Sequence, residues 1–147
     1  MNYEMYARTD TGRVRGNNED AVAFDASLGL CLLADGMGGY SAGEVASGMA
    51  VGGVWQALGP WLRQYPQSGT EALRQAMADC VQEANRAICR LASAHSSYAG
   101  MGTTLVVGVF EQDRLLLGHV GDSRCYRRRG QSVEQLTKDH SMLQEQL

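Results

Sequence analysis

The sequence predicts an α+β fold in which sheet and helices form separate layers. Short apolar runs typical of strands come first, two long segments with the apolar period of helices follow, and strand-like runs close the chain. Because strands and helices are segregated along the chain, an antiparallel sheet is favoured over repeated βαβ units. The 147 residues suit a single domain with a sizeable core, covering residues 1–147.

Three strands are predicted before the first helix. Residues 3–9 form the first, and a turn at 10–12 follows it. Residues 21–24 and 28–34 form a strand pair around the loop 25–27.

The first helix has a clear start signal. Ser41 and Glu44 form a capping box, which satisfies backbone N–H groups at a helix start. Gly59 and Pro60 predict that the helix ends or kinks there. Gly48, Gly52 and Gly53 would weaken it in isolation, so they predict close packing against a sheet. Its apolar stripe is Ala46, Met49, Ala50, Gly53, Val54, Ala57, Leu58 and Trp61.

A second helix begins at another predicted capping box, Ser68 and Glu71, and ends in the polar run 93–97. Apolar residues recur on one side of this helix, which predicts that this side is buried. The stripe is Leu73, Met77, Cys80, Val81, Ala84, Ile88 and Leu91.

Strand-like runs return after the second helix. Residues 103–110 and 115–120 are nearly continuous in apolar side chains, which predicts that both of their faces are covered. Residues 124–128 and 133–136 predict a further hairpin around 129–131.

Charge and composition narrow the range of partners. The net charge of −3 gives no overall basic field, so neither nucleic acid nor a membrane is a predicted partner. No stretch approaches the ~20 apolar residues that cross a bilayer. The basic run 127–129 beside Gly130 is predicted to be a solvated hairpin tip, with contact to an acidic or phosphorylated partner as the alternative.

The cysteines and the N-terminus bear on location. Four cysteines lack CxxC spacing and lie in apolar patterns, which predicts small buried side chains in a reducing compartment. The first ten residues have no apolar core of a signal peptide. The predicted location is the cytoplasm. The cysteines are Cys31, Cys80, Cys89 and Cys125.

Three acidic turns at predicted strand ends carry the candidate chemistry. Asp20 and Asp35 flank the first strand pair, and Asp122 follows a later strand. Clustered carboxylates repel one another unless a cation lies between them, and hard divalent cations prefer oxygen ligands. Arg15 lies five residues before Asp20, and a guanidinium binds phosphate oxygens two at a time. The pattern therefore predicts a metal-and-phosphate site.

Each turn also has a purely structural interpretation. Residues 15–20 could be a polar loop before a strand. Asp35-Gly36 is a common hairpin turn, but more glycines and a capped helix follow it instead of a return strand. Such a bare backbone allows close approach, so the Gly36 carbonyl could bind a cation together with the Asp35 carboxylate. Asp122 could instead cap a turn, with Arg124 paired to it.

A serine hydrolase site is a remote alternative. Residues 39–43 match the G-x-S-x-G pattern around Ser41, and His140 follows an aspartate in triad order. The serine of that motif must directly follow a strand, whereas Ser41 lies at a predicted helix start. The three histidines show no zinc-ligand spacing, and His119 is predicted to be a core residue with satisfied hydrogen bonds.

Six short motifs follow one another along the chain. They are residues 15–20, 33–39, 43–47, 102–104, 119–124 and 136–141. Their order and spacing resemble the metal-dependent protein serine/threonine phosphatases of the type 2C, or PPM, family in its compact bacterial form.

The resemblance implies a four-layer αββα sandwich of two mostly antiparallel sheets flanked by helices. It implies hydrolysis of phosphoserine and phosphothreonine in proteins by a water activated between two Mn²⁺ or Mg²⁺ ions. Phosphorylated proteins would be the partners, as substrates shared with a cognate kinase. Asp122 would correspond to a ligand of the third, weaker metal of bacterial members.

The resemblance also assigns roles near the first two turns. Asp35 would bridge the two ions and Asp20 would complete part of the shell, which makes both catalytic. The Gly36 carbonyl would bind one ion, and Glu19 would contribute through water. Arg15 would bind the substrate phosphate.

The chain departs from the family pattern in two respects. Met37 stands where some members have a histidine proposed as general acid, so the source of the leaving-group proton stays open. The family domain continues with two further metal aspartates, which no acidic residue after Asp122 matches. We therefore expect an N-terminal portion with little or no activity of its own, in which 142–147 begin another helix. A non-catalytic binding or regulatory module is the alternative.

Overall fold

The computed structural model describes residues 3–39 and 42–140, which form two antiparallel sheets and two long helices. The main sheet contains β1 (Asp20–Asp25), β2 (Leu30–Met37), β3 (Gly102–Thr103), β4 (Leu105–Glu111) and β5 (Arg114–Val120). The helices are α1 (Ala42–Gln64) and α2 (Thr70–Ala94), followed by the 3₁₀ helix η1 (Ser96–Tyr98). The small sheet is the hairpin of β6 (Tyr126–Arg129) and β7 (Ser132–Gln135).

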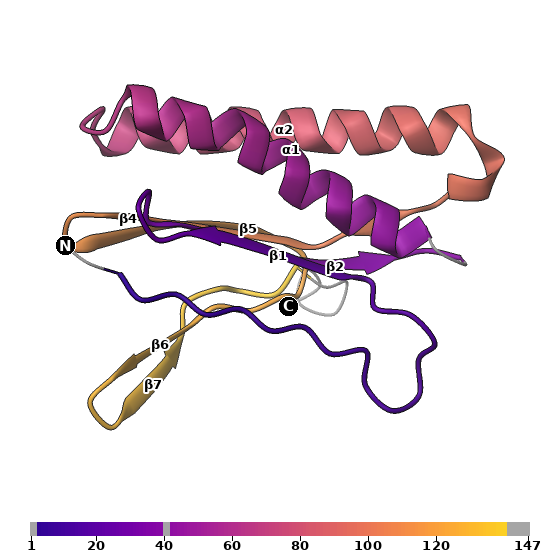
Figure 1. The fold of residues 1–147 in the computed structure, drawn as a ribbon, viewed down its shortest axis with the longest axis horizontal. Helices are drawn as coiled ribbons and strands as arrows, with labels where there is room; N and C mark the ends of the chain where they lie inside the picture. The colour runs from indigo at the N-terminus through magenta and orange to yellow at the C-terminus, as the bar shows by residue number, and fades with distance from the viewer. Residues whose placement is uncertain (1–2, 40–41, 141–147) are drawn as a thin grey trace.

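The predicted α+β class is confirmed. Figure 1 shows α1 and α2 together on one face of the main sheet, with the β6–β7 hairpin projecting from the other side. The part of the chain that is described therefore contains three of the predicted four layers: helices, main sheet and a small second sheet. The start of the predicted terminal helix at 142–147 lies outside the described residues.

The order of strands in the main sheet gathers the acidic turns at one end. The order is β1-β2-β4-β5, every neighbouring pair is antiparallel, and β3 pairs with the last residues of β2. This brings together the beginning of β1, the end of β2, the beginning of β4 and the end of β5. The registers that fix this arrangement are Asp20 opposite Asp35, Leu33 opposite Val106, and Leu105 opposite Val120.

The core lies between the main sheet and the helices. Alternate residues of β2 and β4 face the helices, and the predicted stripe of each helix supplies the other half. Ala57, predicted for the first stripe, is exposed instead. Each fully buried leucine contributes about 1.5–3 kcal/mol through removal of apolar surface from water. The principal core residues are Leu30, Leu32, Ala34, Ala46, Ala50, Val54, Leu58, Leu73, Met77, Ala84, Ile88, Leu105, Val107 and Val109.

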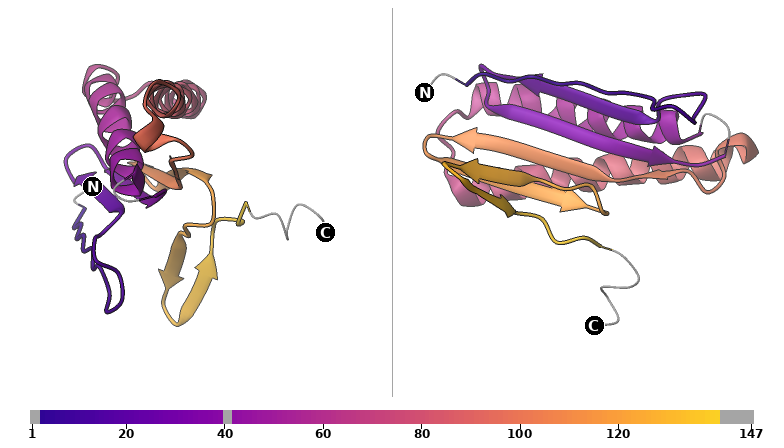
Figure 2. Two further views of the ribbon diagram at one scale, coloured as in Figure 1. Left: turned by 90° about the vertical axis from the view of Figure 1, so that its right-hand side faces the viewer. Right: turned by 90° about the horizontal axis from the view of Figure 1, so that it is seen from below.

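The face of the main sheet away from the helices is only partly covered, contrary to the expectation for 103–110 and 115–120. Phe110 keeps 37% of its surface exposed, although the Tyr3 ring lies 5.1 Å from its ring centre. The N-terminal segment follows this face in Figure 2. The predicted strand at 3–9 is wrong for this structure, because the segment pairs with no strand among the described residues. A strand requires a hydrogen-bonded partner.

Both helix boundaries differ from the sequence expectation. The first helix passes through Pro60 and ends at Gln64, since Trp61 and Leu62 still pack on the core and offset the hydrogen bond that proline removes. Its predicted capping residue Ser41 lies outside the described residues.

The second helix begins without the predicted capping box. Gly69 occupies the N-cap with φ of 83°, in the left-handed region that glycine tolerates, and no side chain caps the helix there. Glu71 instead pairs with Arg74 one turn along the helix, with an N–O distance of 2.6 Å. The predicted role of Ser68 is therefore wrong.

Gly48, Gly52 and Gly53 of α1 do not mark close packing against the sheet. A Cβ at Gly48 or Gly52 would meet nothing within 4 Å, and one at Gly53 would lie 3.6 Å from Ala84 of α2. We therefore expect Gly48→Ala to stabilise the chain by about 0.5–1 kcal/mol, because alanine loses less backbone entropy in a helix. Urea denaturation measures this gain, and a loss of stability would show that the site is not open.

The cysteines are partly as predicted. Cys31, Cys80 and Cys125 are half-buried, and burial raises the pKa of each thiol. Cys89 is exposed, contrary to the prediction. No helix within residues 3–39 and 42–140 is long and apolar enough to span a membrane.

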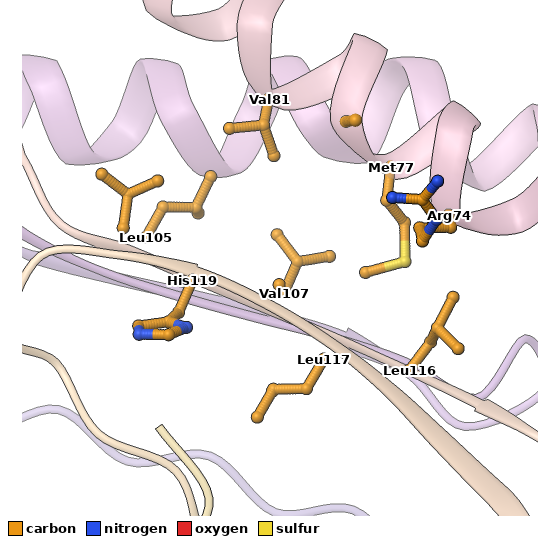
Figure 3. A pocket seen from close by; sticks show the side chains of 11 residues that line it. Arg74, Met77, Val81, Leu105, Val107, Leu116, Leu117 and His119 are labelled. Atoms are coloured by element: carbon orange, nitrogen blue, oxygen red, sulfur yellow. The ribbon is translucent and has the colours of Figure 1, made fainter. Parts of the chain in front are cut away.

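An apolar groove separates α2 from β5, as Figure 3 shows. Met77, Val81 and Leu105 line it from the helix side of the sheet, whereas Leu117 and His119 project from the opposite side of the strand. The Nε2 atom of His119 donates to the Lys138 carbonyl at 2.7 Å. The prediction of a satisfied histidine is therefore confirmed, although the residue is only half-buried.

Candidate metal centre

Asp20 and Asp35 are directly opposite each other in the β1–β2 pair. Opposite residues of an antiparallel pair project from the same face, with Cβ atoms about 4.5–5.5 Å apart. Ala34 and Gly36 face the helices, so both carboxylates project from the other face, where the two residues are exposed. The register alone thus holds two negative charges side by side.

The pKa of Asp35 shows what surrounds this pair. Partial burial is the main cause that raises it above 3.8, and the negative charge of Asp20 is the next. Arg15 lowers the pKa of Asp35, while Asp122 raises it further. Asp20, Arg15 and Asp122 therefore all lie within electrostatic range of Asp35 at this end of the sheet.

Glu19 joins the beginning of β1 to the start of α1. Its carbonyl accepts the Gly36 N–H at 3.0 Å, and its side chain is only 14% exposed. The carboxylate lies against Gly43, where a Cβ would come within 2.8 Å of Glu19 Cδ. The partial positive charge at the N-terminus of α1 favours a negative charge such as this carboxylate. Arg15 Nη1 lies 3.9 Å from Glu19 Oε2 but keeps its side chain 70% exposed, so its guanidinium remains accessible.

Two threonines hold the backbone at the end of β2. Asp35 donates its N–H to Thr104 Oγ1 at 2.9 Å, and Thr104 returns its own N–H to the Asp35 carbonyl at 2.9 Å. Thr103 Oγ1 also donates to that carbonyl, at 3.0 Å. Neither threonine was among the predicted site residues, although residues 102–104 form one of the six motifs that carry the family resemblance.

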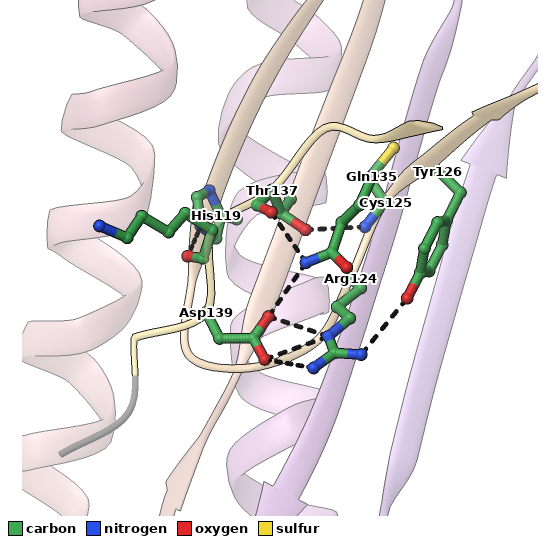
Figure 4. Close-up of polar contacts among 8 residues, drawn as sticks. His119, Arg124, Cys125, Tyr126, Gln135, Thr137 and Asp139 are labelled. Carbon is green, nitrogen blue, oxygen red and sulfur yellow. Dashed lines mark hydrogen bonds and ion pairs between the residues drawn. The ribbon is translucent and has the colours of Figure 1, made fainter. Parts of the chain in front are cut away.

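Arg124 pairs with Asp139 and not with Asp122, which corrects the alternative left open by the sequence. Figure 4 shows its guanidinium in a two-pronged contact with Asp139, with Nε to Oδ1 at 2.9 Å and Nη2 to Oδ2 at 2.6 Å. Gln135 donates to the same carboxylate at 3.3 Å. The Asp139 side chain is 13% exposed. Asp122 is thereby left outside this ion pair.

The Arg124 contact lowers the pKa of Asp139 below 3.8. A lowered carboxyl pKa gives stability that is complete above the unfolded value and lost as the pH falls through the folded value. We therefore expect Asp139→Asn to lower the thermal midpoint at pH 7, and we expect this difference to shrink as the pH falls below 3.8 and through the folded pKa. Thermal unfolding of both proteins across this range measures the difference; a constant difference at all pH values would contradict it.

The donor atoms at this end of the sheet are of the type that a hard divalent cation binds. All are carboxylate or backbone oxygens. Within the described residues, however, no three His, Cys, Asp or Glu side chains are arranged to hold one ion. Asp122 is close enough to shift a pKa but not to close around a common ion with the other two aspartates. The residues therefore fit part of a coordination shell.

The remote serine hydrolase alternative gains no support here. Its nucleophile Ser41 lies outside the described residues. The ring of the predicted triad residue His140 contacts the turn after β5, where its Nδ1 accepts the Gly121 N–H at 3.4 Å.

Comparison with known proteins places this arrangement in a family. Residues 12–145 match the protein phosphatase 2C family. The chain belongs to this family. The phosphatase 2C chain is 38% identical over 143 residues to the serine/threonine phosphatase stp of Listeria monocytogenes, covering 95% of this chain and 56% of that protein. It is 40% identical over 138 residues to the serine/threonine protein phosphatase PstP of Mycobacterium tuberculosis, covering 94% of this chain and 25% of that protein.

Solved structures agree with the phosphatase 2C assignment. The catalytic domain of PstP in complex with two manganese ions superimposes with a TM-score of 0.80 at 38% identity. The S. agalactiae serine/threonine phosphatase superimposes with a TM-score of 0.81 at 36% identity. In both cases 94% of this chain covers 56% of the solved chain. The chain thus spans about half the length of these structures and of the Listeria relative.

Proposed function

We propose that this chain supplies one side of the active site of a metal-dependent phosphatase that acts on phosphoserine and phosphothreonine in proteins. The observation that carries the proposal is the register pair of Asp20 and Asp35 with Arg15 beside it. Two carboxylates held on one exposed face suit a cation, and an accessible guanidinium beside them suits a phosphate group. Membership of the phosphatase 2C family supports the same reaction.

The proposed cofactor is Mn²⁺ or Mg²⁺, in two or three ions. Asp20 and Asp35 would hold two of them with the Gly36 carbonyl, Glu19 would contribute through water, and Asp122 would serve a third. Bound divalent ions lower the pKa of a water molecule and neutralise charge on phosphoryl oxygens. The manganese complex of the PstP catalytic domain supports this choice of metal.

Arg15 would bind the phosphate of the substrate, oriented by Glu19. In a form of the protein that turns over, we expect Arg15→Ala to raise KM, with about 1–3 kcal/mol of charge-assisted binding lost. Steady-state kinetics on a phosphothreonine peptide measures this. Arg8→Ala is the matched control, because Arg8 is 86% exposed and pairs with Asp10 instead. Equal changes of KM in the two variants would show that Arg15 does not bind the substrate phosphate.

The test of the proposed function is hydrolysis of a phosphothreonine peptide by this chain with Mn²⁺ and with EDTA. Turnover that requires Mn²⁺ would support catalysis and would show that one side of the centre suffices. No hydrolysis by a folded chain that still binds Mn²⁺ would support a partial metal centre that needs further ligands for catalysis. A folded chain that neither binds Mn²⁺ nor hydrolyses the peptide would refute the metal centre.

A non-catalytic binding or regulatory module is the second candidate. It is favoured by the incomplete coordination shell among the described residues. Calorimetry with the phosphothreonine peptide discriminates the two: binding without Mn²⁺ and without turnover is expected of the module, whereas the phosphatase requires the ion.

Phosphorylated proteins are the proposed partners, as substrates of an opposing serine/threonine kinase, and the cytoplasm is the proposed location. Four unpaired thiols support a reducing compartment.

A further inference from the structure

Thr104 lies where two of the acidic turns meet. It follows β3 and precedes β4, opposite the end of β2. Its hydroxyl accepts the Asp35 N–H at 2.9 Å, and its own N–H donates to the Asp35 carbonyl at the same distance. Both backbone groups of Asp35 are therefore bound to one residue.

The same hydroxyl reaches the turn after β5. Thr104 Oγ1 lies 2.7 Å from Ser123 Oγ, a distance at which either hydroxyl can donate. On the other side of Asp122, Gly121 has φ of 94°, and a Cβ there would lie 2.7 Å from the Thr104 methyl carbon. The two neighbours of Asp122 in the chain thus both contact the side chain of Thr104, one through its oxygen and one through its methyl group.

We propose that Thr104 is a positioning residue that fixes the Asp122 turn against the end of β2 and so sets the separation between Asp122 and Asp35. The cation in this inference rests on the proposed function. Asp122 itself is exposed and takes no part in the Arg124 ion pair, so the contacts of its neighbours decide where its carboxylate lies.

Substitution of Thr104 by valine or by serine separates the contribution of its hydroxyl group from that of its methyl group. Thr104→Val keeps the shape and the methyl group, but it removes the acceptor for the Asp35 N–H and the bond to Ser123. Thr104→Ser keeps both hydrogen bonds. Thr137→Val is the matched control, because Thr137 is buried and its hydroxyl also accepts a backbone N–H. That N–H comes from Cys125, at 3.1 Å, just after the Asp122 turn and not from Asp35.

The first measurement is the affinity of the chain for Mn²⁺. Electron paramagnetic resonance measures it through the signal of the free ion. We expect Thr104→Val to weaken it at least tenfold, and Thr104→Ser and Thr137→Val to stay within twofold of the original chain. Equal weakening by Thr104→Val and Thr137→Val would reduce the effect to general destabilisation and overturn the proposal. Unchanged affinity in Thr104→Val would also overturn it.

The second measurement uses the metal-free chain, so it separates this inference from the metal centre. The ¹⁵N order parameter of Asp122 is expected to fall from the rigid range of about 0.85 to about 0.6 or below in Thr104→Val alone. If the original chain binds no Mn²⁺, the proposed metal centre fails, and this order parameter still decides whether Thr104 holds the turn. An unchanged order parameter would overturn the positioning role.

Discussion

Replacement of Asp35 by asparagine is expected to weaken Mn²⁺ binding at least about 100-fold and, at the same time, to stabilise the metal-free chain. The loss of affinity follows from removal of one of the two carboxylates that the β1–β2 register holds side by side, since hard cations depend on ligand charge. The gain in stability follows from the same register, because like charges directly opposite each other destabilise a strand pair by about 0.2–1 kcal/mol.

The dependence of this gain on pH has a definite sign. The pKa of Asp35 is raised in the folded chain, so folding is penalised wherever the carboxyl is ionised. The penalty is complete above the folded pKa and disappears as the pH falls below 3.8, where folded and unfolded chains are both protonated. The stabilisation by Asp35→Asn should therefore be present at pH 7 and absent at about pH 2.

Isothermal titration with Mn²⁺ and urea denaturation without metal measure the two effects. Asp20→Asn should change both in the same directions, because it removes the other member of the pair. Asp113→Asn is the control: its side chain is 82% exposed in the β4–β5 turn. An Asp35→Asn chain that binds Mn²⁺ normally, or that loses stability, would contradict the paired-carboxylate centre.

The acidic site was predictable in position but not in geometry. Apolar runs located the strands, and the carboxylates at their ends followed directly. Asp20 and Asp35 lie opposite each other on one face because of the register of the β1–β2 hairpin. A slip of one residue would move the side chains of one strand to the other face of the sheet. That register comes from turn geometry: Asp25 Oδ1 accepts the Ser27 N–H at 2.9 Å, and Gly29 has φ of 64°.

Three differences from prediction arise from contacts between residues that are distant along the chain. The partner of Arg124 is Asp139, fifteen residues away, whereas local spacing had left pairing with the nearer Asp122 as an alternative. Thr104 gains its role from Asp35, which is 69 residues earlier. Packing of Trp61 on the core carries α1 past a proline at which local propensity predicts that a helix ends or kinks. In each case tertiary contacts outweighed the local signal.

Gly36→Ala is expected to destabilise the chain by about 3 kcal/mol or more, the largest effect of any single methyl group added near the site. Gly36 is buried between the end of β2 and the first turn of α1. A Cβ there would overlap the carbonyl of Gly43 and would lie 2.9 Å from the carbonyl oxygen of Glu19. Both obstacles are backbone atoms, so no change of rotamer relieves the clash, and strand and helix must separate.

Two further glycines turn this expectation into a ranking. Gly43→Ala should cost less than Gly36→Ala, because its nearest obstacle is the Glu19 carboxyl group at 2.8 Å, which can rotate away, although the Gly36 carbonyl carbon lies at 2.9 Å. Gly16→Ala should cost almost nothing, because a Cβ there meets nothing within 4 Å. Urea denaturation of the three variants gives the order. If Gly36→Ala were as harmless as Gly16→Ala, strand and helix would not meet backbone to backbone, and the turn that carries Asp35 would need another support.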